Sequence, residues 1–89
     1  MAGNPFELLI LKAGGAVVDT ALVLGVDPAD ISKLRRGQAV RITDKVRQGL
    51  MALRMDVEAV EAEYQAYRAE KIERLREQVR LELSKGDEQ

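Results

Sequence analysis

Helix start and stop signals divide the first forty residues of the chain into short segments. There are two prolines, and each follows a residue that caps helices, in Asn4-Pro5 and Asp27-Pro28. Glycines close the apolar segments at Gly14-Gly15, Gly25 and Gly37. Because glycine adopts left-handed backbone conformations at little cost, it commonly ends a helix. These signals predict short helices joined by tight turns.

The first segment, Phe6 to Leu11, is apolar nearly all round. Asn4 as cap and Glu7 three residues later form a capping box, which predicts a helix buried on several sides. A short strand is the alternative for these residues. Since the apolar run is short and carries an acidic residue, we expect part of the fold and not a signal peptide.

The next two segments carry their apolar residues at helical spacing. Residues 16–24 place Val17, Ala21 and Leu24 on one face. After the glycine at position 25, Asp27 caps a third helix, in which Ile31 and Leu34 share the buried face.

Two further helices are predicted beyond residue 40. Thr43 caps the fourth, whose apolar stripe consists of Ile42, Val46, Leu50 and Leu53. A fifth helix begins at Asp56, unless the fourth bends and continues. Residues 57–83 contain neither proline nor glycine, which allows about 40 Å of uninterrupted helix. We expect residues 86–89 to fray.

The composition of the 89-residue chain excludes several kinds of chemistry. Without cysteine or histidine it has no disulfide, no thiolate nucleophile, no imidazole base and no ordinary zinc site. Its acidic residues show no paired or metal-binding spacing, and Gly14-Gly15 lacks the preceding strand and following Lys-Ser/Thr of a phosphate loop. We therefore expect neither an enzyme nor a protein that needs a cofactor or a metal.

The net charge of −1 hides a difference between the two parts of the chain. Residues 1–55 hold eight basic and five acidic side chains, whereas residues 56–89 hold six basic and ten acidic. The N-terminal part is therefore mildly basic and the C-terminal part acidic, which indicates a different role for each. No apolar run reaches about 18 residues, so no membrane span is expected. The missing cysteines fit a reducing compartment, and we expect a cytoplasmic protein.

At residues 17–37, "VVDTALVLGVDPADISKLRRG", the spacing of Ala21, Gly25 and Ile31 resembles the helix-turn-helix of the lambda-type phage repressor and Cro family. The helix before it and the "RITDKVRQGLMAL" helix after it lie where that family has helices, so the resemblance covers about residues 4–55. It implies an all-α protein. A compact four-helix, lambda-repressor-like bundle would occupy residues 1–55, a long oligomerisation helix residues 56–85, and a frayed tail residues 86–89.

The resemblance also implies which residues meet double-stranded DNA, because the second helix of the pair enters the major groove. The residues in base-contacting positions are Pro28, Ala29, Ser32, Lys33 and Arg36. Those placed to hold backbone phosphates are Arg35, Arg41, Thr43 and Lys45.

This segment departs from the family pattern in two ways. Pro28 and Ala29 stand where hydrogen-bonding side chains are usual, and Asp27 and Asp30 bring negative charge close to the DNA. The alternative is a purely structural corner whose arginines are a solvated face.

The apolar positions of the tail helix follow a heptad spacing in each half, with a slip of one residue near Lys71. They are Val57, Val60, Tyr64, Tyr67, Ile72, Leu75, Val79 and Leu83, and the first seven form the predicted oligomer interface. A lone helix cannot bury such a stripe, so we expect the chain to self-associate through it as a dimer or tetramer. The bundle would then stay folded when residues 57–89 are deleted. The alternative is that the tail packs on the bundle of its own chain.

Together these expectations describe a sequence-specific transcription regulator, repressor or activator, of a phage or mobile element. RNA polymerase is a further candidate partner. Two other functions stay open. One is a viral DNA-packaging recognition subunit that forms a ring, and the other is a protein-binding adaptor whose helix-turn-helix does not bind DNA.

Overall fold

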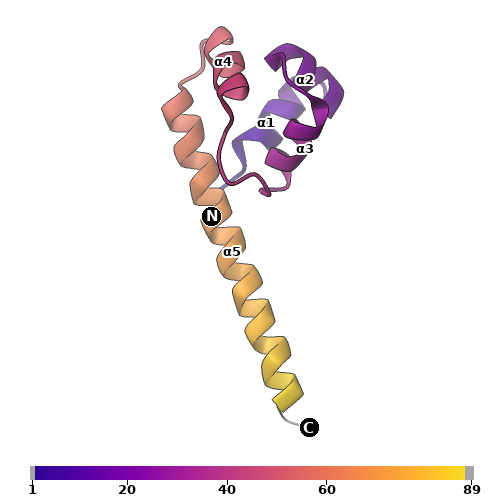
Figure 1. Cartoon of the computed structure of the whole chain (residues 1–89), viewed down its shortest axis with the longest axis vertical. Helices are drawn as coiled ribbons and strands as arrows, with labels where there is room; N and C mark the ends of the chain where they lie inside the picture. The colour runs from indigo at the N-terminus through magenta and orange to yellow at the C-terminus, as the bar shows by residue number, and fades with distance from the viewer. Residues whose placement is uncertain (1, 88–89) are drawn as a thin grey trace.

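The computed structural model describes residues 2–87 and is all-helical over that range (Figure 1). The five helices are α1 (Pro5–Lys12), α2 (Val17–Leu24), α3 (Pro28–Arg35), α4 (Asp44–Ala52) and α5 (Val57–Asp87). The strand considered for the first apolar segment is wrong, because those residues form α1.

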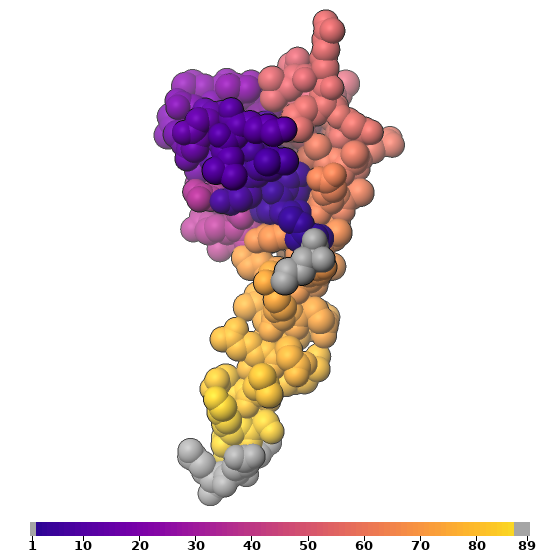
Figure 2. Space-filling view, turned by 180° about the vertical axis from the view of Figure 1, so that it is seen from behind, coloured from indigo at the N-terminus to yellow at the C-terminus, as the bar shows by residue number. Residues whose placement is uncertain are grey.

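The first four helices gather around one end of α5, and the rest of α5 extends beyond them (Figure 1). The molecule therefore measures 55 × 23 × 20 Å. Figure 2 shows the same division from behind, with the second half of α5 projecting from the bundle.

The capping residues predicted for three helices are confirmed. The side-chain oxygens of Asn4 and Asp27 each accept a hydrogen bond of 2.9 Å, from the amides of Phe6 and Ala29. The Thr43 hydroxyl accepts from the Val46 amide at 3.4 Å. These contacts satisfy amides that have no partner within the first turn of a helix.

Two local details differ from the predictions. The Glu7 carboxylate does not close the predicted capping box on Asn4, since it accepts from the Arg35 guanidinium at 3.1 Å. Leu53 does not continue the buried stripe of α4, because it is the C-cap residue of that helix and is 39% exposed. The stripe ends one turn earlier, at the fully buried Leu50.

One apolar core is built from all five helices and the loop before α4. Its buried members are Phe6, Ile10, Ala21, Leu24, Ile31, Leu34, Ile42, Val46, Leu50, Val60 and Tyr64. Helices α2 and α4 approach closely at Gly49, where a Cβ atom would lie 2.3 Å from the Leu24 carbonyl oxygen. Only glycine allows this contact without movement of the backbone.

The first half of α5 completes the core, which corrects the predicted division at residue 56. Val60 and Tyr64 are buried against the other helices, and the Tyr64 ring packs edge-on against Phe6 with the ring centroids 5.5 Å apart. The ion pair between Arg47 and Glu61 also joins α4 to α5. Residues 1–55 are therefore not a complete four-helix bundle, and the tail packs on its own chain in this half.

The C-terminal end of the helix also lies later than predicted. Gly86 and Asp87, which the sequence places in the tail, belong to α5, whereas residues 88 and 89 of the expected tail lie outside the described residues.

The position of Tyr64 predicts where the chain can be shortened. Truncation after residue 71 should preserve a cooperatively unfolding bundle, because all buried residues remain. Truncation after residue 56 should abolish it, since losing a single large core side chain already costs about 3–5 kcal/mol of a total of roughly 5–15 kcal/mol. Thermal unfolding followed by circular dichroism compares the two. A cooperative transition in the shorter chain would contradict this account of the core.

Candidate nucleic-acid interface

The α2–α3 corner has a geometry set by glycine and by its caps. Gly25 ends α2 in a left-handed conformation (φ 71°), which turns the chain sharply into α3. Asp27 then caps α3, and Pro28 occupies its first turn. The buried side chains of Ile31 and Leu34 hold α3 against the core. The opposite face of α3 consequently points to solvent.

That face carries the residues predicted to contact bases. Pro28, Ala29, Lys33 and Arg36 are exposed, and Ser32 is half-buried. The Arg36 guanidinium lies back along the helix, with Nε donating to the Ser32 carbonyl at 3.3 Å. The structure thus places four of these positions on the solvent side of α3 and the fifth, Arg36, at its C-cap.

Several of the predicted DNA-contacting residues line one groove beside α3. It is lined by Lys33 from α3, by Arg41 from the loop after it, and by Thr43 at the start of α4. Asp30 lies in the same groove and reduces its positive charge. Lys45 is exposed in the first turn of α4 but does not line the groove.

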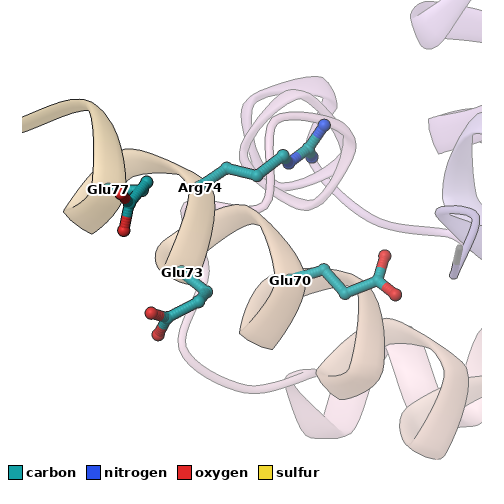
Figure 3. A pocket seen from close by; sticks show the side chains of 4 residues that line it. All are labelled: Glu70, Glu73, Arg74 and Glu77. Carbon is teal, nitrogen blue, oxygen red and sulfur yellow. The ribbon is translucent and has the colours of Figure 1, made fainter. Parts of the chain in front are cut away.

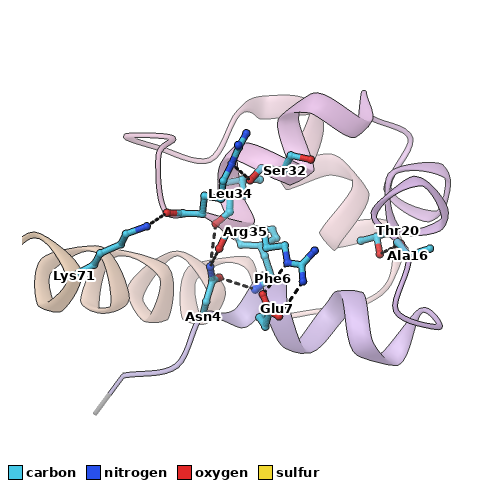
Figure 4. A network of polar contacts seen from close by, with 10 residues as sticks. Asn4, Phe6, Glu7, Ala16, Thr20, Ser32, Leu34, Arg35 and Lys71 are labelled. Carbon is cyan, nitrogen blue, oxygen red and sulfur yellow. Dashed lines mark hydrogen bonds and ion pairs between the residues drawn. The ribbon is translucent and has the colours of Figure 1, made fainter.

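Arg35 differs from the other predicted phosphate contacts. Its guanidinium pairs with Glu7 of α1 through hydrogen bonds of 3.1 and 3.5 Å (Figure 4). Both side chains are 46% exposed, so the pair adds little to stability. It does direct Arg35 toward α1. Among residues 2–87, no comparable acidic partner lies within 4 Å of Lys33, Arg36, Arg41 or Lys45.

Asn4 has a second role that its place before α1 does not indicate. While its Oδ1 caps α1, its Nδ2 donates to the carbonyls of Leu34 and Arg35, at 3.0 and 2.9 Å (Figure 4). These carbonyls belong to the last turn of α3, where a helix has no internal donors. One amide side chain therefore joins the start of α1 to the end of α3.

Side chains of α5 hold the loop that follows α3, and none of them was among the predicted DNA-site residues. Tyr64, Gln65 and Arg68 donate to the carbonyls of Ala39, Val40 and Gly37, at 2.6, 2.8 and 3.0 Å respectively. Lys71 donates to the Arg36 carbonyl (Figure 4). We call these four side chains the α5 clamp and residues 36–43 the α3–α4 loop.

The tyrosine of the α5 clamp stays protonated over the ordinary pH range. Burial raises the pKa of the Tyr64 phenol, although the nearby Arg68 cation acts in the opposite direction. The hydroxyl therefore remains a hydrogen-bond donor to the Ala39 carbonyl.

Four of the seven residues predicted to form an oligomer interface contact their own chain instead. Val60 and Tyr64 are core residues, Val57 packs against the core, and Tyr67 is half-buried beside Gly37. The heptad pattern correctly indicated a buried face, but it does not say which surface covers that face.

The other three predicted interface residues lie on the projecting half of α5, residues 72–87. Ile72 is half-buried, whereas Leu75 and Val79 are 50% and 55% exposed, and all three line one shallow groove with Arg76 and Arg80. A second groove on this helix is lined by Glu70, Glu73, Arg74 and Glu77 (Figure 3). The projecting half is thus an exposed amphipathic helix.

Ion pairs within the projecting half support it as a helix. Arg80 pairs with Glu77 at 2.7 Å and with Glu73 at 3.2 Å. The first of these pairs is spaced i,i+3, and pairs at that spacing stabilise an isolated helix by a few tenths of a kcal/mol each. Within residues 2–87, no three His, Cys, Asp or Glu side chains form a group that could hold a metal ion, and no helix is long and apolar enough to cross a membrane.

Comparison of the chain with protein-family models, with curated proteins and with solved structures finds no match.

The cap of α3 gives a direct test of how this face is built. Asp27→Ala should lower the free energy of unfolding by roughly 0.5–2 kcal/mol, because the Ala29 amide loses its acceptor. Asp27→Asn is the matched control, since it removes the charge and keeps a side-chain oxygen that can cap. Urea unfolding of both variants measures the difference. Equal destabilisation by the two substitutions would mean that the charge, and not the cap, matters at this position.

Proposed function

We propose that the chain binds double-stranded DNA through the α2–α3 corner, used as a helix-turn-helix of the lambda repressor and Cro type. The observation that carries the proposal is the solvent face of α3. A capped helix, held by two buried side chains, presents Lys33 and Arg36 outward, and Arg41 lies across the adjoining groove from Lys33. An α-helix with such a face fits the major groove of DNA, where it reads base edges.

Each residue group has a distinct role in this proposal. Ser32, Lys33 and Arg36 offer hydrogen bonds to base edges or phosphates, while Ala29 offers an apolar contact to a thymine methyl group. Arg41, Thr43 and Lys45 hold backbone phosphates and so fix the position of α3 on the duplex. Arg35 is the weakest member of the predicted set, because binding a phosphate would require it to leave Glu7.

The acids near the start of α3 limit affinity in this proposal. Asp27 is used by the cap, and Asp30 lies in the groove with Lys33 and Arg41. Repulsion between these carboxylates and phosphates weakens non-specific binding, most strongly at low salt. A site of this kind depends on base contacts more than on charge, which fits a sequence-specific regulator of transcription.

The projecting half of α5 supplies the second part of the proposal. Its exposed apolar stripe of Ile72, Leu75 and Val79 associates with the same helix of a second copy. A two-fold dimer places two recognition helices on half-sites about 34 Å apart, one turn of DNA. Binding sites selected from a random duplex library should accordingly contain two related half-sites.

The contribution of the α3 face is measurable by substitution. Lys33→Ala and Arg36→Ala should each weaken binding to a selected site by roughly 1–3 kcal/mol if the side chain contacts a base. Arg54→Ala is the control, because Arg54 is an exposed cation in the turn between α4 and α5, away from α3 (Figure 1). Fluorescence anisotropy with a labelled duplex gives the affinities. If wild-type protein binds no duplex at any salt concentration, the DNA proposal is wrong, and the protein-binding alternative is the one to test next.

The role of the projecting helix has its own test. Leu75→Glu should shift full-length protein toward the monomer, because it places a charge in the apolar stripe. Leu81→Glu is the matched control, since Leu81 is similarly exposed but lies about 120° and about 160° around the helix from Leu75 and Val79, outside the stripe, at about 100° per residue. Sedimentation velocity distinguishes the species. A monomeric wild type at tens of micromolar would refute self-association, and a large ring would favour the DNA-packaging function.

A further inference from the structure

The α3–α4 loop is held from outside along most of its length. The side chains of the α5 clamp donate hydrogen bonds to the carbonyls of four of the first five residues of that loop, which are Arg36, Gly37, Ala39 and Val40. Donor and acceptor in these hydrogen bonds are 25 to 35 residues apart in the sequence. The conformation of this loop therefore depends on where α5 lies.

Direct packing adds to these hydrogen bonds at Gly37. This residue has a left-handed backbone (φ 70°), and a Cβ atom here would lie 2.9 Å from the Tyr67 ring. The loop consequently leaves α3 in close contact with α5, with no room for a side chain between them.

The chemistry of the α5 clamp suits the end of a helix. The last carbonyls of a helix lack internal donors and carry the negative end of its dipole, which cations stabilise. Asn4 satisfies the carbonyls of Leu34 and Arg35, and Lys71 and Arg68 satisfy those of Arg36 and Gly37. Two cations from a distant helix thus complete the C-terminal end of α3.

We infer that Arg68 and Lys71 are positioning residues for DNA binding, which fix the α3–α4 loop and thereby the placement of Arg36 and Arg41 relative to Lys33. This inference rests on the proposed DNA-binding function. Arg36 is the first residue of the loop and Arg41 lies five residues later. The α5 clamp binds the carbonyls of Arg36, Gly37 and Val40, so it holds the backbone between the two arginines. Without the two cations the loop samples other conformations, and fewer of them present both arginines to the duplex.

The experiment compares single variants of the full-length chain. Arg68→Met and Lys71→Met remove a cation that contacts the loop and keep an unbranched side chain of helical propensity. Arg74→Met is the matched control. It removes the same charge from the same helix, but Arg74 lies beside Glu70, Glu73 and Glu77 and makes no hydrogen bond to the loop among the described residues (Figure 3).

Two measurements separate the inference from the function on which it rests. The first is hydrogen exchange of the Gly37 and Gln38 amides, which donate to the carbonyls of Leu34 and Lys33. Exchange should become roughly three- to tenfold faster in Arg68→Met and Lys71→Met, and stay unchanged in Arg74→Met, as expected for one lost hydrogen bond. This measurement requires no DNA.

The second measurement is affinity for a mixed-sequence duplex over a range of salt concentrations. A positioning role predicts roughly three- to tenfold weaker binding, and predicts that this loss disappears when Arg36 and Arg41 are also changed to Met, because the two cations then have no DNA-contacting arginine left to position. Direct phosphate contact by Arg68 or Lys71 instead predicts the same loss of affinity in that background, with a slope reduced by about 0.9 per lost contact, and would overturn the inference. Unchanged amide exchange, or faster exchange with unchanged affinity, would also overturn it. Wild-type protein that fails to bind DNA would refute the proposed function, while the exchange result would still show whether the two cations hold the loop.

Discussion

The contact between Tyr64 and Phe6 is the interaction on which the rest of the structure depends. Phe6 lies in the first turn of α1 and Tyr64 lies two turns into α5, so their packing joins the two ends of the described core. The same tyrosine reaches the Ala39 carbonyl with its hydroxyl. A single side chain thus closes the apolar core and anchors the loop after α3. In a domain of this size each large buried ring is a substantial fraction of the stability.

Local sequence signals predicted the individual helices but not how α5 is used. Asn4, Asp27 and Thr43 cap the helices as predicted, because a cap is a contact between residues two or three positions apart. The buried pair Ile31 and Leu34 was likewise evident from helical spacing. The heptad spacing of Val60 and Tyr64 indicated a buried face, yet periodicity carries no information on the partner. The prediction that these two residues face a second copy of the chain is therefore wrong.

The polar contacts around α3 could not have been predicted in this way. Asn4 reaches carbonyls 30 and 31 residues away, and the α5 clamp spans similar separations. Hydrogen bonds to backbone carbonyls leave no pattern in the acceptor residues, since every residue offers the same group. Arg35 is a comparable case. Its charge suggested a phosphate contact, while its pairing with Glu7 becomes visible only when α1 and α3 are packed together. Of the proposed DNA face, the sequence thus indicated the helix and its outward residues but not the contacts that hold them.

Because α5 is a continuous helix, its two halves cannot be treated as independent. The α5 clamp ends at Lys71, and the exposed apolar stripe begins at the next residue, Ile72. A helix transmits displacement along its axis far better than a loop, since each residue is held by hydrogen bonds to the turns before and after it. Any change in the position of the projecting half relative to the bundle must either bend α5 near residues 71 and 72 or disturb the hydrogen bonds to Arg36 and Gly37. The same helix that carries the exposed apolar stripe therefore also holds the loop beside α3.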